Sequence, residues 1–142
     1  MTAYTCSYAT PGALSAPEVL ALYRAVGWTA YTDSPDTLMQ ALAGSATVAV
    51  AHSGDKLVGL ARVVSDGHTI CYLQDVLVYP DHQRSGVGRD LVAAALAPYS
   101  GVRQKVLLTD NEPGQEAFYQ SLGFVQSTVF PGTPLHAFVR FD

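Results

Sequence analysis

The sequence predicts an α/β (α+β) fold: a mixed, mostly antiparallel sheet of about six to seven strands, flanked by four helices in the order βααβββαβαββ. Three observations carry this prediction. Short apolar or alternating runs are bounded by Gly, Pro, Asn or Asp, as in strands. Other segments repeat apolar residues at three- and four-residue spacing, as in helices. One run, residues 70–78, is almost uninterrupted, which is typical of a central strand buried on both faces.

The first part of the chain is predicted to form an edge strand followed by two helices. Small, polar and aromatic residues alternate at residues 2–8, which we expect to be the edge strand. The segment 15–27 has Ser15 as its N-cap, helical spacing of apolar residues and a terminal glycine. The segment 34–44 repeats this design with a serine cap, a proline in the first turn and a glycine stop. Residues 28–33, between the two helices, are expected to be a loop.

The rest of the chain is predicted to complete the sheet. Residues 46–64 hold two apolar runs around the turn Ser53-Gly54-Asp55-Lys56, which indicates a hairpin. A second turn, at Asp66-Gly67, leads into the run 70–78. The remaining expected elements are a helix from residue 86 to about 97, a strand at 105–110, a helix at 114–123, and strands at 124–130 and 135–141.

The bulk composition favours one folded domain, residues 1–142. Charged residues make up 14% and apolar residues 49% of the chain, which indicates a chain with a sizeable core. The net charge of −4 argues against a nucleic-acid partner, because phosphate binding needs a basic surface. No run approaches the roughly 20 apolar residues of a membrane span, and the N-terminus lacks signal-peptide features, so we expect a cytoplasmic protein without a membrane partner.

Cysteine and histidine usage points away from disulfides and metals. Cys6 and Cys71 are two isolated cysteines, which we expect to be free thiols. None of the four histidines lies three or four residues from another, so no metal site is expected.

The segment "QRSGVG", residues 83–88, lies between the buried run 70–78 and a helix. Such a glycine-bearing turn can direct several backbone N–H groups at one anion, and the helix dipole adds to the attraction. A helix start with incidental glycines is the alternative. The glycine patterns of Rossmann dinucleotide sites and of P-loops are not matched.

The segment "VLVYPDHQRSGVGRDLV" resembles the acetyl-CoA-binding segment of the GNAT superfamily of N-acetyltransferases, whose pattern is Q/R-x-x-G-x-G/A after a strand. Gln83, Gly86 and Gly88 occupy its fixed positions. Further along, "FYQSLGF" at residues 118–124 resembles the superfamily's Y-x-x-x-G-F helix end. The expected order of strands and helices also fits the superfamily from residue 3 to residue 141. The resemblance implies an N-acetyltransferase that uses acetyl-CoA (coenzyme A).

The resemblance also implies which residues hold the cofactor. The backbone of Val76, Leu77 and Val78 would bind the pantetheine arm, with an N–H near Leu77 polarising the thioester carbonyl. Asn111 is a further candidate contact, although it lies one residue further from Tyr119 than the superfamily's asparagine does. Tyr119 matches a tyrosine that protonates the departing thiolate in many relatives. The loop residues expected to hold the pyrophosphate are Gln83, Arg84, Ser85, Gly86, Val87, Gly88 and Arg89.

On the acceptor side, Asp75 is the candidate for removing the amine proton. It is an acid in an otherwise apolar central strand, where an uncompensated charge is costly, so a functional role would explain its presence. The alternative is that Asp75 simply pairs with Arg62 of the preceding strand. Both residues are counted among the candidate substrate-binding residues. Trp28, Tyr31 and Asp33 lie in the region that shapes the acceptor pocket of the superfamily. The two aromatic residues would clamp an amine by cation–π contact, or they are a lid of the core.

We therefore expect acetyl transfer from acetyl-CoA to a primary amine by direct attack in a ternary complex. A small molecule is the favoured acceptor, with an amino sugar or an alkyl or aryl amine as sub-hypotheses. Two rivals stay open. One is a protein acetyltransferase that acts on an N-terminus or a lysine, and the other is a non-catalytic acyl-CoA-binding regulatory module. A homodimer is a further open possibility.

Overall fold

The computed structural model describes residues 3–10 and 12–142, which divide into two compact units within residues 1–107 and 108–142. The start of the predicted edge strand, Thr2, lies outside the described residues. The expectation of a single domain remains a prediction, and each unit is described by itself below.

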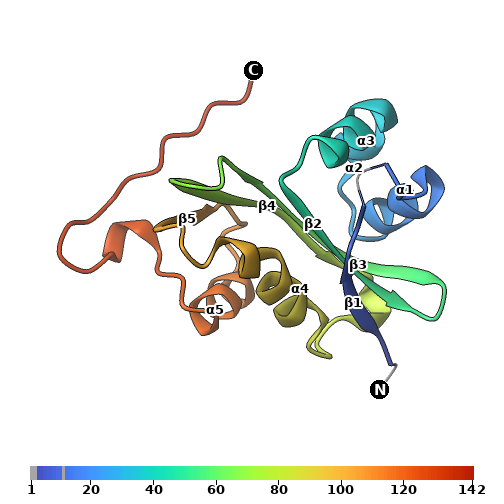
Figure 1. Cartoon of the computed structure of the whole chain (residues 1–142). Coiled ribbons are helices and arrows are strands. Elements are labelled where there is room, and N and C mark those ends of the chain that lie inside the picture. The colour runs from blue at the N-terminus through green and yellow to red at the C-terminus, as the bar shows by residue number, and fades with distance from the viewer. Residues whose placement is uncertain (1–2, 11) are drawn as a thin grey trace. The chain divides into compact units, whose positions relative to one another are not determined.

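The first unit is built on one sheet with the strand order β1-β2-β3-β4-β5 (Figure 1). The strands β1 to β4 pair antiparallel in sequence order, and β5 is parallel to β4. The mixed, mostly antiparallel sheet is thus confirmed, but the predicted number of strands is wrong, because the described residues form five. The strands are β1 (Thr5–Tyr8), β2 (Thr47–Ser53), β3 (Lys56–Ser65), β4 (Ile70–Val78) and β5 (Gln104–Leu107).

Helices cover both faces of this sheet. Figure 1 shows α1 to α3 gathered on one face and α4 on the other. A short helix occupies the segment predicted to be a loop, since Asp33 N–H donates to the Thr29 carbonyl at 2.9 Å and Thr32 is buried. The helices are α1 (Ala16–Ala25), α2 (Thr29–Thr32), α3 (Pro35–Ala43) and α4 (Val87–Leu96), with 3₁₀ turns at Pro80–His82 and Ala97–Tyr99.

The core between the sheet and the first helices uses the apolar face of each element. Tyr23 of α1 and Leu38 of α3 are almost fully buried. They belong to one cluster with Leu60 and Leu77 of the two central strands. Successive residues of a strand point to opposite faces of the sheet. Leu60 therefore points toward α1, and its neighbour Gly59 points toward α4.

Close packing of α4 on the sheet depends on Gly59. A Cβ atom at Gly59 would lie 2.7 Å from Leu91 Cδ1, 3.1 Å from Val87 Cγ1 and 3.3 Å from the Leu77 carbonyl oxygen. The helix bearing the loop "QRSGVG" is therefore held against β3 and β4 at a distance that only glycine permits.

Gly59→Ala is expected to lower the free energy of unfolding by about 1–3 kcal/mol, the usual cost of overpacking. Thermal and urea denaturation measure this change. Gly101→Ala is the matched control, because a Cβ there meets no atom within 4 Å. Equal destabilisation by the two substitutions would contradict the close packing of α4.

An extra residue in β4 changes the face to which its side chains point. Arg62 and Val63 are adjacent in β3, but their partners in β4 are Asp75 and Leu73. Gln74 is therefore the extra residue of a β-bulge. Directly paired side chains share a face, so Leu73 lies on the α4 face with Val63, whereas Asp75 lies on the α1 face with Arg62. The bulge thus turns Asp75 toward the first helices.

The second unit contains helix α5 (Pro113–Ser121) and a 3₁₀ turn at Ser127–Val129. The strands predicted at 124–130 and 135–141 are wrong, because residues 108–142 form no strand. The backbone of residues 127–130 is used in the 3₁₀ turn, where Phe130 N–H donates to the Ser127 carbonyl at 3.3 Å. Phe138 and Phe141 are 95% and 91% exposed, so the apolar pattern at 135–141 is not accompanied by a buried, paired strand.

Candidate functional site

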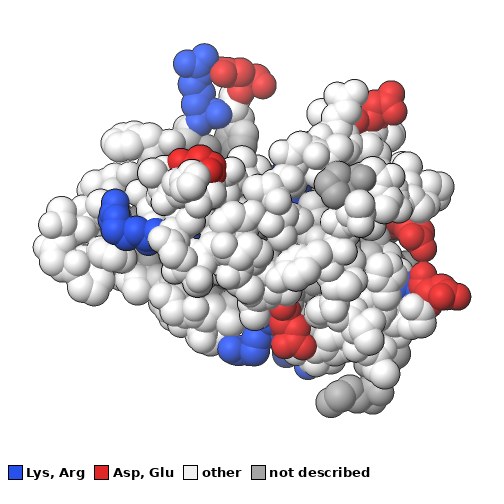
Figure 2. Space-filling view, in the orientation of Figure 1, with Lys and Arg blue, Asp and Glu red and all other residues white. Residues whose placement is uncertain are grey.

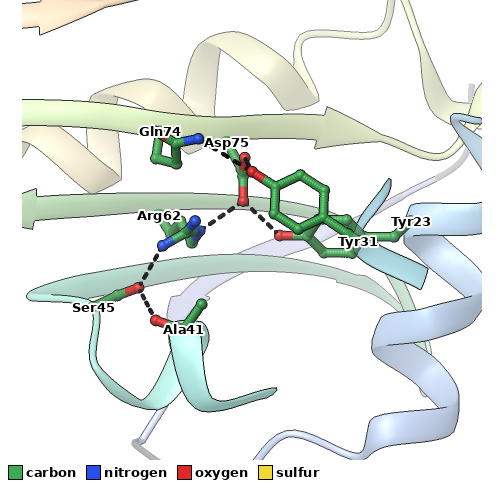
Figure 3. A network of polar contacts seen from close by, with 7 residues as sticks. All are labelled: Tyr23, Tyr31, Ala41, Ser45, Arg62, Gln74 and Asp75. Atoms are coloured by element: carbon green, nitrogen blue, oxygen red, sulfur yellow. Dashed lines mark hydrogen bonds and ion pairs between the residues drawn. The ribbon is translucent and has the colours of Figure 1, made fainter. Parts of the chain in front are cut away.

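Asp75 is the centre of a buried polar network on the α1 face of the sheet. Its side chain is 2% exposed and accepts three hydrogen bonds (Figure 3). Arg62 Nε donates to Oδ2 at 2.6 Å, and the Tyr23 hydroxyl donates to the same oxygen at 2.9 Å. The Tyr31 hydroxyl donates to Oδ1 at 2.9 Å. Three elements, α1, α2 and β3, thus converge on one carboxylate.

The network extends outward at both ends (Figure 3). On one side, Arg62 Nη1 donates to Ser45 Oγ at 3.3 Å, and Ser45 Oγ donates to the Ala41 carbonyl at 2.8 Å. On the other side, Gln74 Nε2 donates to the Tyr31 hydroxyl oxygen at 3.1 Å. Gln74 is exposed, so the chain of hydrogen bonds runs from the buried ion pair to the surface.

The electrostatics keep the network in one protonation pattern. Burial acts to lower the pKa of Arg62, but the hydrogen bond and the charge of Asp75 outweigh it, and the net pKa is raised. The pKa of Tyr23 is raised well above its ordinary value, first by burial and then by the charge and hydrogen bond of Asp75. Arg62 therefore stays charged, and Tyr23 stays a donor.

The structure brings together three of the predicted acceptor-side residues, namely Tyr31, Arg62 and Asp75. The ion pair between Arg62 and Asp75, which is the alternative explanation for the acid in β4, is present at 2.6 Å. A further role for Asp75 in proton transfer stays a prediction.

The two aromatic candidates also lie beside this network. The rings of Trp28 and Tyr31 are 6.1 Å apart, and both pack edge-on against Tyr23 at 6.0 and 5.2 Å. Both residues are partly buried against the core, as a lid would be. The cation–π role stays a prediction. Asp33 is exposed and closes α2 with its backbone N–H.

Three side chains of the network, those of Tyr23, Ser45 and Gln74, were not among the predicted site residues. In the sequence, Tyr23 is one of the helically spaced apolar residues of the segment 15–27, a pattern that indicates a core position. Gln74 could have been found from sequence, because it is the one uncharged polar residue next to an acid in the run 70–78.

The glycine loop adopts the backbone that an anion cradle needs. Arg84 and Gly86 have positive φ values of 62° and 93°. Gly86 is the N-cap of the ten-residue helix α4 and has no side chain with which to cap the first N–H groups. A Cβ on Gly86 would lie 3.3 Å from the Tyr4 hydroxyl, so a larger residue would be both strained and crowded. These features fit a phosphate-bearing ligand.

Side chains tie the loop to its neighbours. Gln83 Nε2 donates to the Val78 carbonyl at 3.1 Å, and Ser85 Oγ donates to the His82 carbonyl at 2.5 Å. Tyr4 donates to Asp90 in the first turn of α4 at 2.5 Å, which raises the pKa of Tyr4 to about 12. Gln83 and Ser85, both predicted to hold the cofactor, thus also hold the loop in its conformation.

The loop follows a strand with a partly unpaired edge. The ladder between β4 and β5 pairs Ile70 with Gln104 and ends where Leu73 pairs with Leu107. Beyond that point β4 continues to Val78, still paired with β3. Among the described residues, no strand pairs with the β5 side of residues 74–78. The predicted pantetheine contacts, Val76, Leu77 and Val78, lie in this stretch. Tyr79 N–H donates to the Val58 carbonyl of β3, and the backbone of Leu77, two residues earlier, faces β3 as well. The backbone of Val76 and Val78 faces the free edge, where an extended ligand can pair as a further strand would.

The predicted proton donor Tyr119 and the predicted contact Asn111 belong to the second unit. Tyr119 lies in α5, partly buried, with Phe118 and Phe124 at ring distances of 5.0 and 6.1 Å. Burial raises the pKa of Tyr119, so its phenol keeps its proton. Asn111 is exposed and precedes α5.

A cavity of about 250 Å³ lies away from these groups, between the end of β1, the end of α3 and the start of β2. Ser45 is its one residue that also belongs to the Asp75 network. The face of the molecule in Figure 2 carries scattered charges of both signs. No helix in residues 3–10 and 12–142 combines the length and the apolar character needed to cross a membrane.

Residues 44–126, more than half of the chain, match the model of the acetyltransferase (GNAT) domain family. A protein assigned as an acetyltransferase in Gibberella zeae is 36% identical over 78 residues, which are 53% of this chain and 43% of that protein. An uncharacterized N-acetyltransferase of Pyropia yezoensis is 30% identical over 74 residues, 52% of this chain and 42% of its own length. The match thus spans less than half the length of these curated relatives.

Solved structures of acetyltransferases are also similar to this chain. A GNAT-family acetyltransferase from Streptococcus pneumoniae is 31% identical with a TM-score of 0.79, covering 98% of this chain and 100% of its own. An aminoglycoside acetyltransferase from an uncultured soil sample, solved with sisomicin, shares the fold at 17% identity, a TM-score of 0.68 and coverages of 98% and 97%. The chain belongs to the GNAT acetyltransferase family.

Proposed function

We propose that this chain transfers the acetyl group of acetyl-CoA to the nitrogen of a small primary amine, by direct attack in a ternary complex. The observation that carries the proposal is the unpaired edge of β4 leading directly into the glycine loop and the N-terminus of α4. This arrangement offers backbone hydrogen bonds to an extended arm, followed by N–H groups for a diphosphate. Acetyl-CoA has these two parts in that order, and it supplies an activated thioester.

On the acceptor side, the amine must lose a proton before it can attack, because an alkylamine with a pKa near about 10 is mostly protonated at neutral pH. The Asp75 network offers a route. The amine proton passes to the Tyr31 oxygen while the Tyr31 proton passes to Asp75 Oδ1, the carboxylate oxygen that Arg62 and Tyr23 leave free. The amine is then neutral, and Asp75 holds the proton.

The leaving thiolate also needs a proton. Tyr119 supplies it, since its raised pKa keeps the phenol protonated at neutral pH. Tyr119 then carries the negative charge until solvent returns a proton to it.

The melting temperature with and without acetyl-CoA tests the cofactor half of the proposal. At about 100 times its dissociation constant a ligand stabilises by about 2.7 kcal/mol. For a domain of this size we expect a rise of roughly 5–10 °C. Gly86→Val should abolish this rise, because a β-branched residue is strained at a φ of 93° and its Cβ would press on the Tyr4 hydroxyl, so the loop would lose its conformation.

Gly12→Val is the matched control for backbone strain, since Gly12 also has a positive φ, of 78°, but a Cβ there meets no atom within 4 Å. This variant should melt lower yet keep the full shift with acetyl-CoA. No shift in the wild-type protein at saturating acetyl-CoA would overturn the proposed function.

A further inference from the structure

The hydrogen bonds from the surface to Asp75 run in one direction only. An ionised carboxylate accepts hydrogen bonds and donates none, so the bond between Tyr31 and Asp75 Oδ1 takes the Tyr31 hydrogen. The Tyr31 oxygen must then be the acceptor in its bond with Gln74. The Gln74 amide nitrogen is therefore committed to Tyr31. The Gln74 carbonyl oxygen, Oε1, is the end of the amide that does not face Tyr31.

The bulge in β4 places this amide at the surface. Gln74 is the extra residue between the two register positions of β4, and it is exposed although it lies between the buried Leu73 and Asp75. Bulges commonly re-aim a side chain next to a functional site. The exposed end of the network therefore consists of Gln74 Oε1 and the second lone pair of the Tyr31 oxygen, which are both acceptors.

We propose that Gln74 Oε1 and the Tyr31 oxygen together bind the protonated form of a primary amine acceptor. This inference rests on the proposed function and names the recognition contact of its acceptor. An ammonium group has three donors and no acceptor, so it satisfies two acceptors without conflict. A carboxylate, which only accepts, is refused. A hydroxyl has one hydrogen and can satisfy only one of the two acceptors.

Recognition here depends on the direction of the hydrogen bonds more than on net charge. Asp75 carries a negative charge, but Arg62 pairs with it at 2.6 Å and offsets it. The other titratable groups that face the carboxylate are the phenols of Tyr23 and Tyr31, with Tyr72 nearby. The same contact places the amine proton where the route through Tyr31 to Asp75 begins.

The variants Gln74→Leu and Tyr31→Phe separate recognition from proton transfer. Gln74→Leu removes an acceptor for the ammonium, so KM for the amine should rise about 10- to 100-fold with a small change in kcat. Tyr31→Phe removes both the contact and the route, so KM should rise and kcat should fall. Gln104→Leu, an exposed glutamine on β5, is the matched control and should leave both constants unchanged.

The experiment uses three amines, each with the alcohol that has a hydroxyl in place of each amine: glucosamine and glucose, tyramine and tyrosol, 1,4-diaminobutane and 1,4-butanediol. Thiol release from acetyl-CoA gives kcat and KM for each amine. The chain has one tryptophan, Trp28, at 6.1 Å from Tyr31, so its fluorescence measures binding of the non-aromatic pairs without turnover. We expect at least one amine to be acetylated, its alcohol not to inhibit, and Gln74→Leu to raise KM.

The outcomes separate this inference from the function on which it rests. If acetyl-CoA raises the melting temperature but none of the amines is acetylated, both the proposed transfer to small amines and the ammonium contact are overturned, while cofactor binding stands. An unchanged KM in Gln74→Leu, or alcohols that bind as well as their amines, also overturns the contact. If acetyl-CoA does not bind, the proposed function itself fails.

Discussion

Asp75→Asn is expected to destabilise the first unit by about 3–5 kcal/mol, because it leaves the Arg62 guanidinium buried without its carboxylate. The two side chains are 2% and 9% exposed, so water cannot replace the lost partner. For a domain of this size the melting temperature should fall by roughly 10–15 °C. Urea denaturation at neutral pH measures the change in the free energy of unfolding.

A double-mutant cycle with Arg62→Met shows whether the pair is the cause. Removing both charges leaves no unpaired ion, so the double variant should be markedly more stable than the sum of the two single losses predicts. Strict additivity of the two losses would mean that the ion pair does not hold the network together. Turnover of the variants should be compared only at temperatures where each is folded.

Tyr119→Phe is expected to lower kcat by about 10²- to 10⁴-fold, the usual contribution of a general acid. The thermal shift with acetyl-CoA should be retained, since the substitution removes one hydroxyl. Tyr8→Phe is the control, because the Tyr8 hydroxyl donates to the Ala94 carbonyl outside the proposed machinery. An unchanged kcat in Tyr119→Phe would remove Tyr119 from the mechanism.

The pH dependence gives a second test of Tyr119. Burial raises its pKa above the ordinary value of 10.0, and the protonated phenol is the active form. Titration of Tyr119 should therefore leave the rate unchanged near neutral pH, and the rate should fall only as the pH rises through this raised pKa. In Tyr119→Phe this alkaline fall should be absent.

Apart from the short helix α2, the sequence predicted the order of elements from β1 to α5, because local patterns indicate each of them. The glycine loop at 83–88 and the near-continuous apolar run of β4 can both be recognised from residues that are adjacent in the sequence. A local pattern also predicted a strand at residues 135–141, and that prediction was wrong. An alternating apolar segment is a strand only when another strand pairs with it, and the sequence does not say whether one does.

Several residues of the candidate site could be predicted from the sequence, but the hydrogen bonds that join them could not. Asp75 stands out as an acid in an apolar strand, and the possible pairing with Arg62 followed from their neighbouring strands. The bulge at Gln74 could not be predicted, because it depends on the register between β3 and β4. That bulge turns Asp75 toward Tyr23 and Tyr31, which are more than 40 positions away in the chain.

The most direct test of the central claim is the initial rate of thiol release from acetyl-CoA by the purified protein, with and without a primary amine. The account predicts release that depends on the amine and yields its N-acetyl product, identified by mass spectrometry. The contradicting result is acetyl-CoA bound with the expected thermal shift, but thiol release no faster with any amine than without one. The chain would then bind acyl-CoA without transferring its acyl group to amines.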